Sequence, residues 1–186
     1  MVSRLPAARR RRQLLDVALD VFARNGFHQT SMEDVADAAG VTKPVLYQHF
    51  GSKRELYLEL LEDVGGQMMV AVAKAVATAR GPHDQVEAGF AAYFRFVADH
   101  RNAFKLLFGG GARRDEEFAD AVRIVERSIA DEIATLIEAD VETEHRLLLA
   151  HGLVGLPAGA SRYWVDREGD TDIDAERLSR RMAQLA

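Results

Sequence analysis

Hydrophobic residues recur along this chain with the spacing of amphipathic α-helices, and no segment alternates apolar and polar residues between hairpin turns as a β-sheet would require. The first regular segment stops at Asn25-Gly26. Later ones are interrupted at Arg80-Gly81-Pro82 and at Gly109-Gly110-Gly111, where a mobile loop is expected. The pattern predicts an all-α protein. The expected helices cover residues 14–25, 31–39, 44–50, 52–78, 83–100, 102–108, 115–138, 144–166 and 172–186.

The stretch from Phe27 to Leu56 combines two short helical patterns with a tight turn between them. Thr30 and Ser31 each precede an acidic residue with the spacing of a capping box, which starts a helix. Gly40 follows that helix where a left-handed residue commonly ends one, and Pro44 stands in the first turn of the next, where a missing N–H is tolerated. Together these features form a helix-turn-helix signature.

The second of these helices has the composition of a DNA-reading surface. Leu46 and Phe50, one helical turn apart, are expected to pack inward on the first helix. A further capping pattern, Ser52-x-x-Glu55, starts the next helix and places Lys53 near a helix N-terminus, where a DNA phosphate can also bind. The outward surface is left to Thr42, Lys43, Val45, Tyr47, Gln48 and His49.

These residues resemble the DNA-binding domain of the TetR (tetracycline-repressor-like) family of one-component transcription regulators. The match covers residues 10–60 and keeps many fixed spacings, which rarely coincide by chance. The matching motifs are Phe22-Ala23-Arg24-Asn25-Gly26-Phe27, Thr30-Ser31-Met32-x-Asp34-Val35-Ala36, Ala39-Gly40-Val41 and Leu46-Tyr47-x-His49-Phe50-x-Ser52-Lys53-x-x-Leu56.

The resemblance implies a fold and individual residue roles. It implies an N-terminal three-helix helix-turn-helix domain, residues 1–53, and a C-terminal helical bundle for ligand binding and dimerisation, residues 54–186. Positions 43–45 vary within the family, so no operator sequence follows from them. In the family, residues matching Thr42, Lys43, Tyr47 and His49 face the major groove or its phosphates, and those matching Thr30, Ser31 and Lys53 bind backbone phosphates.

The net charge of −5 is unevenly distributed. Residues 1–55 hold nine Lys/Arg and six Asp/Glu, a net charge of +3, whereas the remaining residues hold fifteen and twenty-three, a net charge of −8. The run Arg9 to Arg12 is expected just before the first helix. Such a run alone is as readily a solvated tail, but beside the motif phosphate contact is the better interpretation. The candidate DNA-binding residues are Arg10, Arg11, Arg12, Thr30, Ser31, Thr42, Lys43, Pro44, Tyr47, His49 and Lys53.

The amino-acid composition limits the size of the core, the kinds of site and the location that can be expected. With 186 residues, 48% of them apolar, the chain can bury a full core as one large or two small domains. The absence of cysteine excludes disulfides and thiolate-ligated metal centres. The longest apolar stretches, residues 68–79 and 147–160, are interrupted and too short to span a membrane, and the Arg-rich start lacks the apolar core of a secretory signal. A cytoplasmic protein without membrane partners is therefore expected.

Aromatic residues between positions 90 and 118 are candidates for a ligand pocket. Taken singly, each is more readily an ordinary core residue, because every helical bundle needs apolar stripes. The resemblance favours a pocket, since C-terminal domains in the family commonly hold small inducers, here expected to be largely apolar. The candidate lining is Phe90, Tyr93, Phe94, Phe104, Leu107, Phe108, Phe118, Val122, Leu148 and His151.

The last two expected helices are candidates for a dimer interface. Small residues in the penultimate helix permit close approach of another helix, while Pro157 requires a local bend. Packing within one chain is the alternative, and the resemblance favours a homodimer, because family members commonly dimerise through their last two long helices. The candidate interface residues are Gly152, Gly155, Gly159, Trp164, Leu178, Met182 and Leu185.

The histidines form no metal-site spacing, and no nucleophile elbow or phosphate loop occurs, so no enzyme, metal or cofactor is predicted. The favoured hypothesis is a ligand-responsive repressor that binds a palindromic DNA operator as a dimer. Two alternatives stay open: a DNA-binding regulator without a small-molecule effector, and a small-molecule-binding helical protein or enzyme whose helix-turn-helix is incidental.

Overall fold

The computed structural model describes residues 6–108, 116–137, 140–166 and 174–184. This part of the chain holds nine helices and no strand, which confirms the predicted all-α class. The glycine loop expected at residues 109–111 and the start of the last expected helix lie outside the described residues. The helices are α1 (Ala7–Asn25), α2 (Met32–Ala38), α3 (Lys43–Tyr47), α4 (Lys53–Val76), α5 (Pro82–Asp99), α6 (Arg101–Phe108), α8 (Glu116–Leu136), α9 (Thr143–Asp166) and α10 (Ala175–Ala183).

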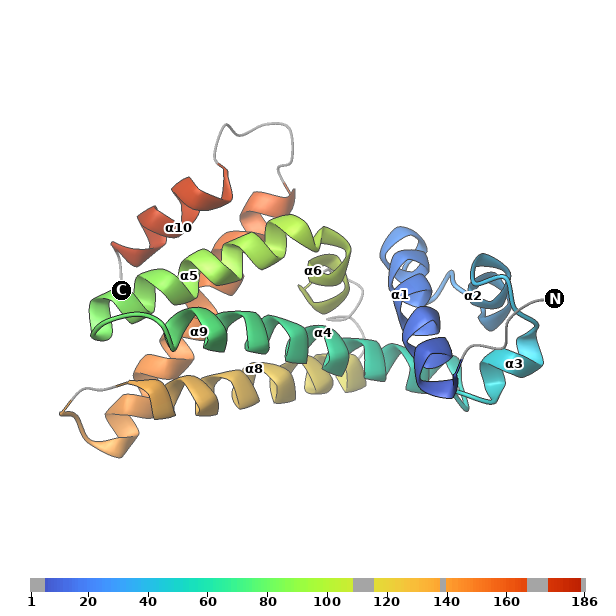
Figure 1. Ribbon diagram of the computed structural model, residues 1–186, viewed down its shortest axis with the longest axis horizontal. Helices are drawn as coiled ribbons and strands as arrows, with labels where there is room; N and C mark the ends of the chain where they lie inside the picture. The colour runs from blue at the N-terminus through green and yellow to red at the C-terminus, as the bar shows by residue number, and fades with distance from the viewer. Residues whose placement is uncertain (1–5, 109–115, 138–139, 167–173, 185–186) are drawn as a thin grey trace.

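The helices form two lobes joined by α4 (Figure 1). Helices α1 to α3 and the first turns of α4 make the N-terminal lobe. The C-terminal lobe is a bundle in which α5 and α8 both pack along α4, α9 crosses behind them, and α10 lies on the outer side of α5. One helix, α4, therefore belongs to both lobes.

Capping serines and a glycine turn determine where helices of the N-terminal lobe begin and end. Ser31 caps α2 with both hydrogen bonds of a capping box, and Ser52 caps α4 by accepting a hydrogen bond from the Glu55 backbone N–H. Gly40 has a φ of 64°, the left-handed conformation predicted for the turn. Leu46 and Phe50 are 0% and 1% exposed, so the predicted inward packing of these two residues is confirmed.

One expectation for this lobe was wrong. The arginine run was expected before the first helix, but α1 begins at Ala7 and includes it. Pro6 precedes the first turn, and arginine is a good helix former. The acidic residues Asp16, Glu59 and Asp63 then bind two of the arginines along the helix. The run is thus part of a folded helix.

Helices α4 and α8 pack closely together at Gly65. Gly65 is buried in α4, and a methyl group added there would overlap the side chain of Val125 in α8. The neighbouring Gly66 has open space around it. Only a residue without a Cβ lets α8 pack this closely at position 65. Within the described residues, no helix is long and apolar enough to cross a membrane.

Candidate DNA interface and ligand cavity

Helix α3 lies at the far end of the N-terminal lobe (Figure 1). At its start and on its outward face Thr42, Lys43, Pro44 and Tyr47 are exposed, and the exposed fraction of Tyr47 is 45%. The Nζ of Lys43 lies 3.8 Å from a carboxylate oxygen of Glu33, a solvent-exposed pair that contributes little to stability. These side chains are free to face a duplex. The two residues that follow α3 are Gln48, which is exposed, and His49, which is half-buried.

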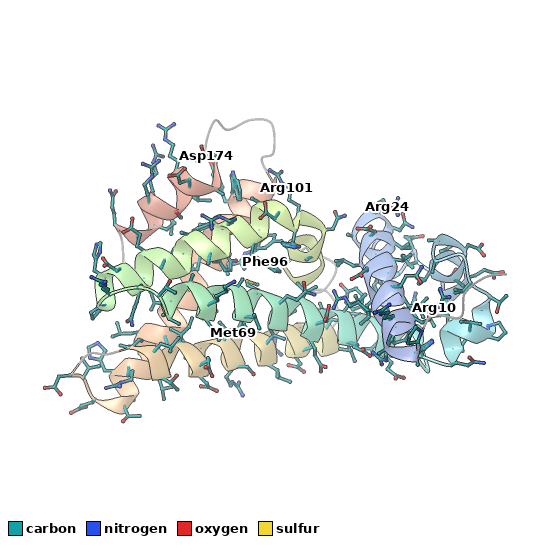
Figure 2. All side chains as sticks on the ribbon, viewed as in Figure 1. Arg10, Arg24, Met69, Phe96, Arg101 and Asp174 are labelled. Atoms are coloured by element: carbon teal, nitrogen blue, oxygen red, sulfur yellow. The ribbon has the colours of Figure 1, made fainter. Side chains whose placement is uncertain are left out.

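Two arginines of α1, Arg11 and Arg12, are bound to acidic residues of α4. Arg11 forms an ion pair with Glu59 of α4, and its guanidinium carbon lies 4.6 Å from the centre of the Phe50 ring. Arg12 contacts Asp63 of α4 at 2.6 Å; although partial burial lowers the pKa of Arg12, its hydrogen bonds to acidic partners raise it overall. Arg10, labelled in Figure 2, donates a hydrogen bond to Gln13. Arg11 and Arg12 therefore tie α1 to α4.

The three residues expected to bind backbone phosphates have internal partners. The Lys53 ammonium donates hydrogen bonds to the carbonyl oxygens of Phe27 (2.8 Å) and Thr30 (2.7 Å), and it lies 4.4 Å from the centre of the Phe27 ring. The hydroxyl of Thr30, a residue only 2% exposed, donates to the Gly26 carbonyl. Hydrogen bonds from the Ser31 backbone and hydroxyl lower the pKa of Asp34. Lys53 thus uses two of its three donors to hold the chain between α1 and α2.

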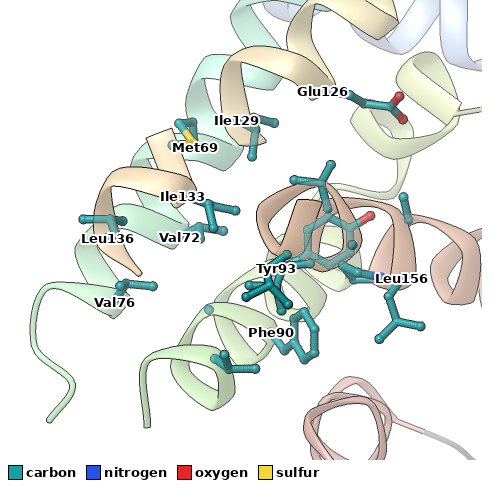
Figure 3. A pocket seen from close by; sticks show the side chains of 18 of the residues that line it. Met69, Val72, Val76, Phe90, Tyr93, Glu126, Ile129, Ile133, Leu136 and Leu156 are labelled. Atoms are coloured by element: carbon teal, nitrogen blue, oxygen red, sulfur yellow. The ribbon is translucent and has the colours of Figure 1, made fainter. Parts of the chain in front are cut away.

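An elongated cavity of about 550 Å³ opens between α4, α5, α8 and α9. Its volume lies in the range usual for small-molecule sites. Phe90, Tyr93, Val122 and Leu148 line it, as proposed from the sequence. Further apolar side chains of α4, α8 and α9 complete the wall, and the sequence alone did not indicate that they enclose a space. Figure 3 shows Met69, Val72, Ile129, Ile133, Leu136 and Leu156 among them.

The other proposed lining residues lie elsewhere. Phe94 and Phe104 are buried in the core away from the cavity wall, and His151 is exposed on α9. Phe118 is completely buried at the junction of the lobes, where its ring centre lies 4.6 Å from that of Phe27 and 4.5 Å from that of Tyr57. The side chains of Leu107 and Phe108 lie outside the described residues.

Among the described residues of the cavity wall, all are apolar except Gln85, Tyr93 and Glu126. The Tyr93 hydroxyl is buried without a hydrogen-bond partner, and so is the hydroxyl of Ser161 on α9. Burial raises the pKa of Tyr93 strongly, while the nearby Ser161 hydroxyl and Arg162 oppose that shift and Glu126 adds to it. Tyr93 is therefore a neutral phenol throughout the physiological pH range.

Helix α9 presents an apolar surface to solvent. Gly152 and Gly155 are exposed, and a Cβ added at either would meet no atom within 4 Å. Gly159 is half-buried near Arg162. The exposed large residues of this helix are Leu147 (38%), Leu148 (69%), Leu149 (40%), Leu156 (37%) and Tyr163 (59%).

The remaining interface candidates pack within the chain. Met182 of α10 is 9% exposed and Leu178 is half-buried, and α10 packs on α5. Trp164 is half-buried, with the guanidinium carbon of Arg101 5.7 Å from its ring centre. Leu185 lies outside the described residues. The apolar stripe of α10 therefore packs inside the protomer. Packing within one chain is the alternative to a dimer interface that the sequence left open.

Comparison with known proteins shows to which family the chain belongs. Residues 14–60 match the family model of bacterial regulatory proteins of the tetR family, and residues 82–186 match that of the tetracyclin repressor-like C-terminal domain. The chain belongs to the TetR family. It is a DNA-binding transcriptional regulator, as its helix-turn-helix and its relatives show.

The similar TetR-family proteins include regulators of both signs. The transcriptional activator FasR of Mycolicibacterium smegmatis is 34% identical over 93% of this chain and 80% of FasR. The transcriptional repressor KstR2 of the same organism is 33% identical over 58% of this chain and 52% of KstR2.

Solved structures of the family share the whole architecture. A TetR-like regulator from Rhodococcus sp. RHA1 has 30% identity and a TM-score of 0.77, with 98% of this chain and 96% of that chain covered. FadR from Bacillus subtilis, solved in complex with stearoyl-CoA, has a TM-score of 0.80 at 18% identity, covering 94% and 96%, and so shares the fold.

Proposed function

We propose that this TetR-family regulator binds an operator of two inverted half-sites as a homodimer, and that an aliphatic small molecule in the α4/α5/α8/α9 cavity alters its affinity for that operator. The cavity is the observation that carries the proposal, because about 550 Å³ of largely apolar space is ample for such a ligand. The stearoyl-CoA bound by the structural neighbour FadR supports the same ligand class.

The proposed reading surface is the exposed face of α3. Lys43 and Tyr47 project from it, and the adjacent Thr42, Pro44 and His49 complete the surface. Phosphate contacts from Arg10 and Ser31 remain part of the proposal, since each lies at or near a helix N-terminus in the positively charged lobe. Thr30 is 2% exposed with its hydroxyl bound to the Gly26 carbonyl, so its proposed role is to hold the start of α2.

Helices α4 and α8 form the proposed path between the cavity and the reading surface. Helix α8 lines the cavity with Val122 and places Phe118, one turn earlier, against Phe27 of the N-terminal lobe. The Lys53 ammonium binds the carbonyl of Phe27 and lies over its ring. Lys53 and Phe27 flank the start of α2, so a shift of α8 on ligand binding would reach the helix-turn-helix through direct contacts.

The proposed dimer surface is the exposed face of α9 around Gly155 and Tyr163. Exposed apolar side chains and small residues occur together there, which suits close packing of a second copy. In the proposed dimer the two-fold axis has to set the two α3 helices about 34–36 Å apart, so that they reach half-sites one turn of DNA apart.

Two measurements test the proposal after genomic footprinting has defined the operator. Operator affinity is titrated with and without stearoyl-CoA, and stearoyl-CoA affinity is titrated with and without operator. Linkage requires both affinities to change by the same factor, typically about 5- to 150-fold. Equal operator affinities in all ligand concentrations, with stearoyl-CoA and the shorter acyl-CoAs alike, would contradict induction and favour a regulator without a small-molecule effector.

The sign of regulation is tested separately with a promoter reporter. Repression, the expectation from the sequence, predicts higher reporter output when the regulator is deleted. Activation, the function named for FasR, predicts lower output.

A further inference from the structure

Tyr93 places a buried hydroxyl in the wall of the cavity, and the hydroxyl of Ser161 lies close to it, behind the wall. Tyr93 is 8% exposed, Ser161 is completely buried, and neither hydroxyl makes a well-aligned hydrogen bond. In Figure 3 the ring of Tyr93 extends from α5 toward α9. A buried hydroxyl without a well-aligned partner costs free energy, and such groups are uncommon in native proteins. Because Tyr93 lines the cavity, a bound molecule can supply the partner that its hydroxyl lacks.

The charges around these hydroxyls restrict what that partner can be. Glu126 lines the same region, and its labelled carboxylate appears in Figure 3. Among the described residues that line the cavity, none is lysine or arginine. Arg162 lies near Tyr93 but is not part of the wall, and Glu126 opposes its effect on the Tyr93 hydroxyl. A carboxylate placed here would meet the negative charge of Glu126 in a largely apolar wall that contains no described cation, which is unfavourable.

The shape of the cavity restricts the rest of the molecule. The lining residues of α8 run from Val122 to Leu136, about 21 Å at the rise of an α-helix. On α8 the lining is apolar from Ile129 to Leu136, and besides Tyr93 and Glu126 the one other polar residue among the described lining residues is Gln85 on α5. The space therefore suits an extended aliphatic chain whose polar group stops near Tyr93.

We propose that Tyr93, with Ser161 behind it, forms a subsite for an uncharged oxygen on an aliphatic ligand, a carbonyl or hydroxyl, which accepts a hydrogen bond from the Tyr93 hydroxyl. The proposal rests on the proposed function, since it concerns the same cavity. It adds the chemical class of the ligand: a neutral ester, thioester, ketone or alcohol, rather than a free carboxylate.

Three ligand probes of similar chain length separate the effect of a carbonyl oxygen from the effect of a negative charge. Methyl decanoate carries a carbonyl oxygen, decyl methyl sulfide carries only a weakly accepting sulfur, and decanoate carries a negative charge. Each is titrated into the full-length protein loaded with the neutral dye Nile red, and displacement gives its affinity. The wild type is expected to bind the ester about three- to tenfold more tightly than the sulfide, the range of one net hydrogen bond, and more tightly than decanoate.

Matched variants assign that preference to the Tyr93 hydroxyl. Tyr93→Phe should reduce the ester-to-sulfide ratio toward one. Thr78→Val removes a hydroxyl from an exposed residue outside the cavity wall and should leave the ratio unchanged. If the wild type binds ester and sulfide equally, or Tyr93→Phe retains the preference, or decanoate binds most tightly, the subsite is overturned while the cavity remains a ligand site. If the wild type binds neither the dye nor any probe, the proposed function itself fails.

A measurement without ligand provides a second test. Tyr93→Phe removes an unpaired buried hydroxyl and keeps the ring, so the midpoint temperature of thermal unfolding should stay equal or rise. A clear fall would show that the hydroxyl already has a partner in the free protein, and this would overturn the proposal.

Discussion

At the scale of single residues, Lys53 shows why a motif position does not fix a role. The sequence places it correctly at the start of α4, where a phosphate contact is the family's use of a lysine. Its partners in the structure are the carbonyls of Phe27 and Thr30, more than twenty residues earlier in the chain. Such partners depend on how α4 packs against the α1–α2 connection, which no local pattern reveals.

Replacing Lys53 with methionine should therefore reduce stability more than it changes the DNA contact. Loss of hydrogen bonds from a charged donor is expected to lower the free energy of unfolding by about 1.5–3 kcal/mol. Lys43→Met is the matched control, because Lys43 is exposed and its ion pair with Glu33 is weak. That variant should keep its stability and reduce the salt dependence of operator binding by about one phosphate contact.

Urea unfolding and operator titrations over a range of salt concentrations measure both effects. A Lys53→Met protein with unchanged stability but a reduced salt slope would instead make Lys53 a phosphate ligand, as the resemblance implies.

At the scale of helices, the sequence predicts where each element begins and ends better than which faces meet. The predicted range 83–100 compares with an observed α5 of Pro82–Asp99, because glycine, proline and capping residues mark the ends locally. Phe118 and Val122 lie on one stripe of α8, yet only Val122 lines the cavity. The position of α8 along its neighbours decides this, and that position depends on contacts far apart in the sequence.

Gly65 sets the distance between α4 and α8. Gly65→Ala is expected to lower the free energy of unfolding by about 1–3 kcal/mol, because the new methyl group overlaps the stiff side chain of Val125. Gly66→Ala is the control one position away, with open space around it. It should raise stability by about 0.5–1 kcal/mol, the gain expected for alanine in a helix interior. Equal changes of stability in both variants would contradict this account of the packing.

Phe118 offers a test of the path between the lobes. Phe118→Leu keeps an apolar side chain but removes the ring contacts with Phe27 and Tyr57. Ligand binding should persist, since Phe118 does not line the cavity, while the effect of ligand on operator affinity should shrink. Ile124→Ala, an exposed position on α8, is the control and should leave the coupling intact. Full coupling in the Phe118 variant would exclude this route.

At the scale of the whole molecule, the sequence predicts two lobes and a helix-turn-helix but not which surface remains open. The stripe of Leu178 and Met182 reads equally well as an interface or as core, and α5 buries it. Exposed side chains of α9 instead form the apolar surface available to a second copy. Only the packed bundle shows which apolar surface is core and which is open to a second copy.

Charge introduced on the α9 surface should prevent dimerisation without unfolding the protomer. Gly155→Glu and Tyr163→Glu each place a carboxylate on that surface, where a second copy would bury it. Val70→Glu is the control, because Val70 is 69% exposed on α4, away from α9. Sedimentation velocity should show monomers for the two α9 variants and a dimer for the control, and circular dichroism should show the same helical content in all three. Dimers throughout would move the interface elsewhere.

The wall of the cavity and the outer surface of α9 share residues, since Leu148 and Leu156 line the cavity and are also exposed to solvent. If a second copy covers α9, it also covers the route by which a small molecule leaves. The residence time of a bound effector should then depend on protein concentration: long when protomers are paired and short after dilution below the dimer dissociation constant. A regulator with this property retains its signal for as long as it remains assembled.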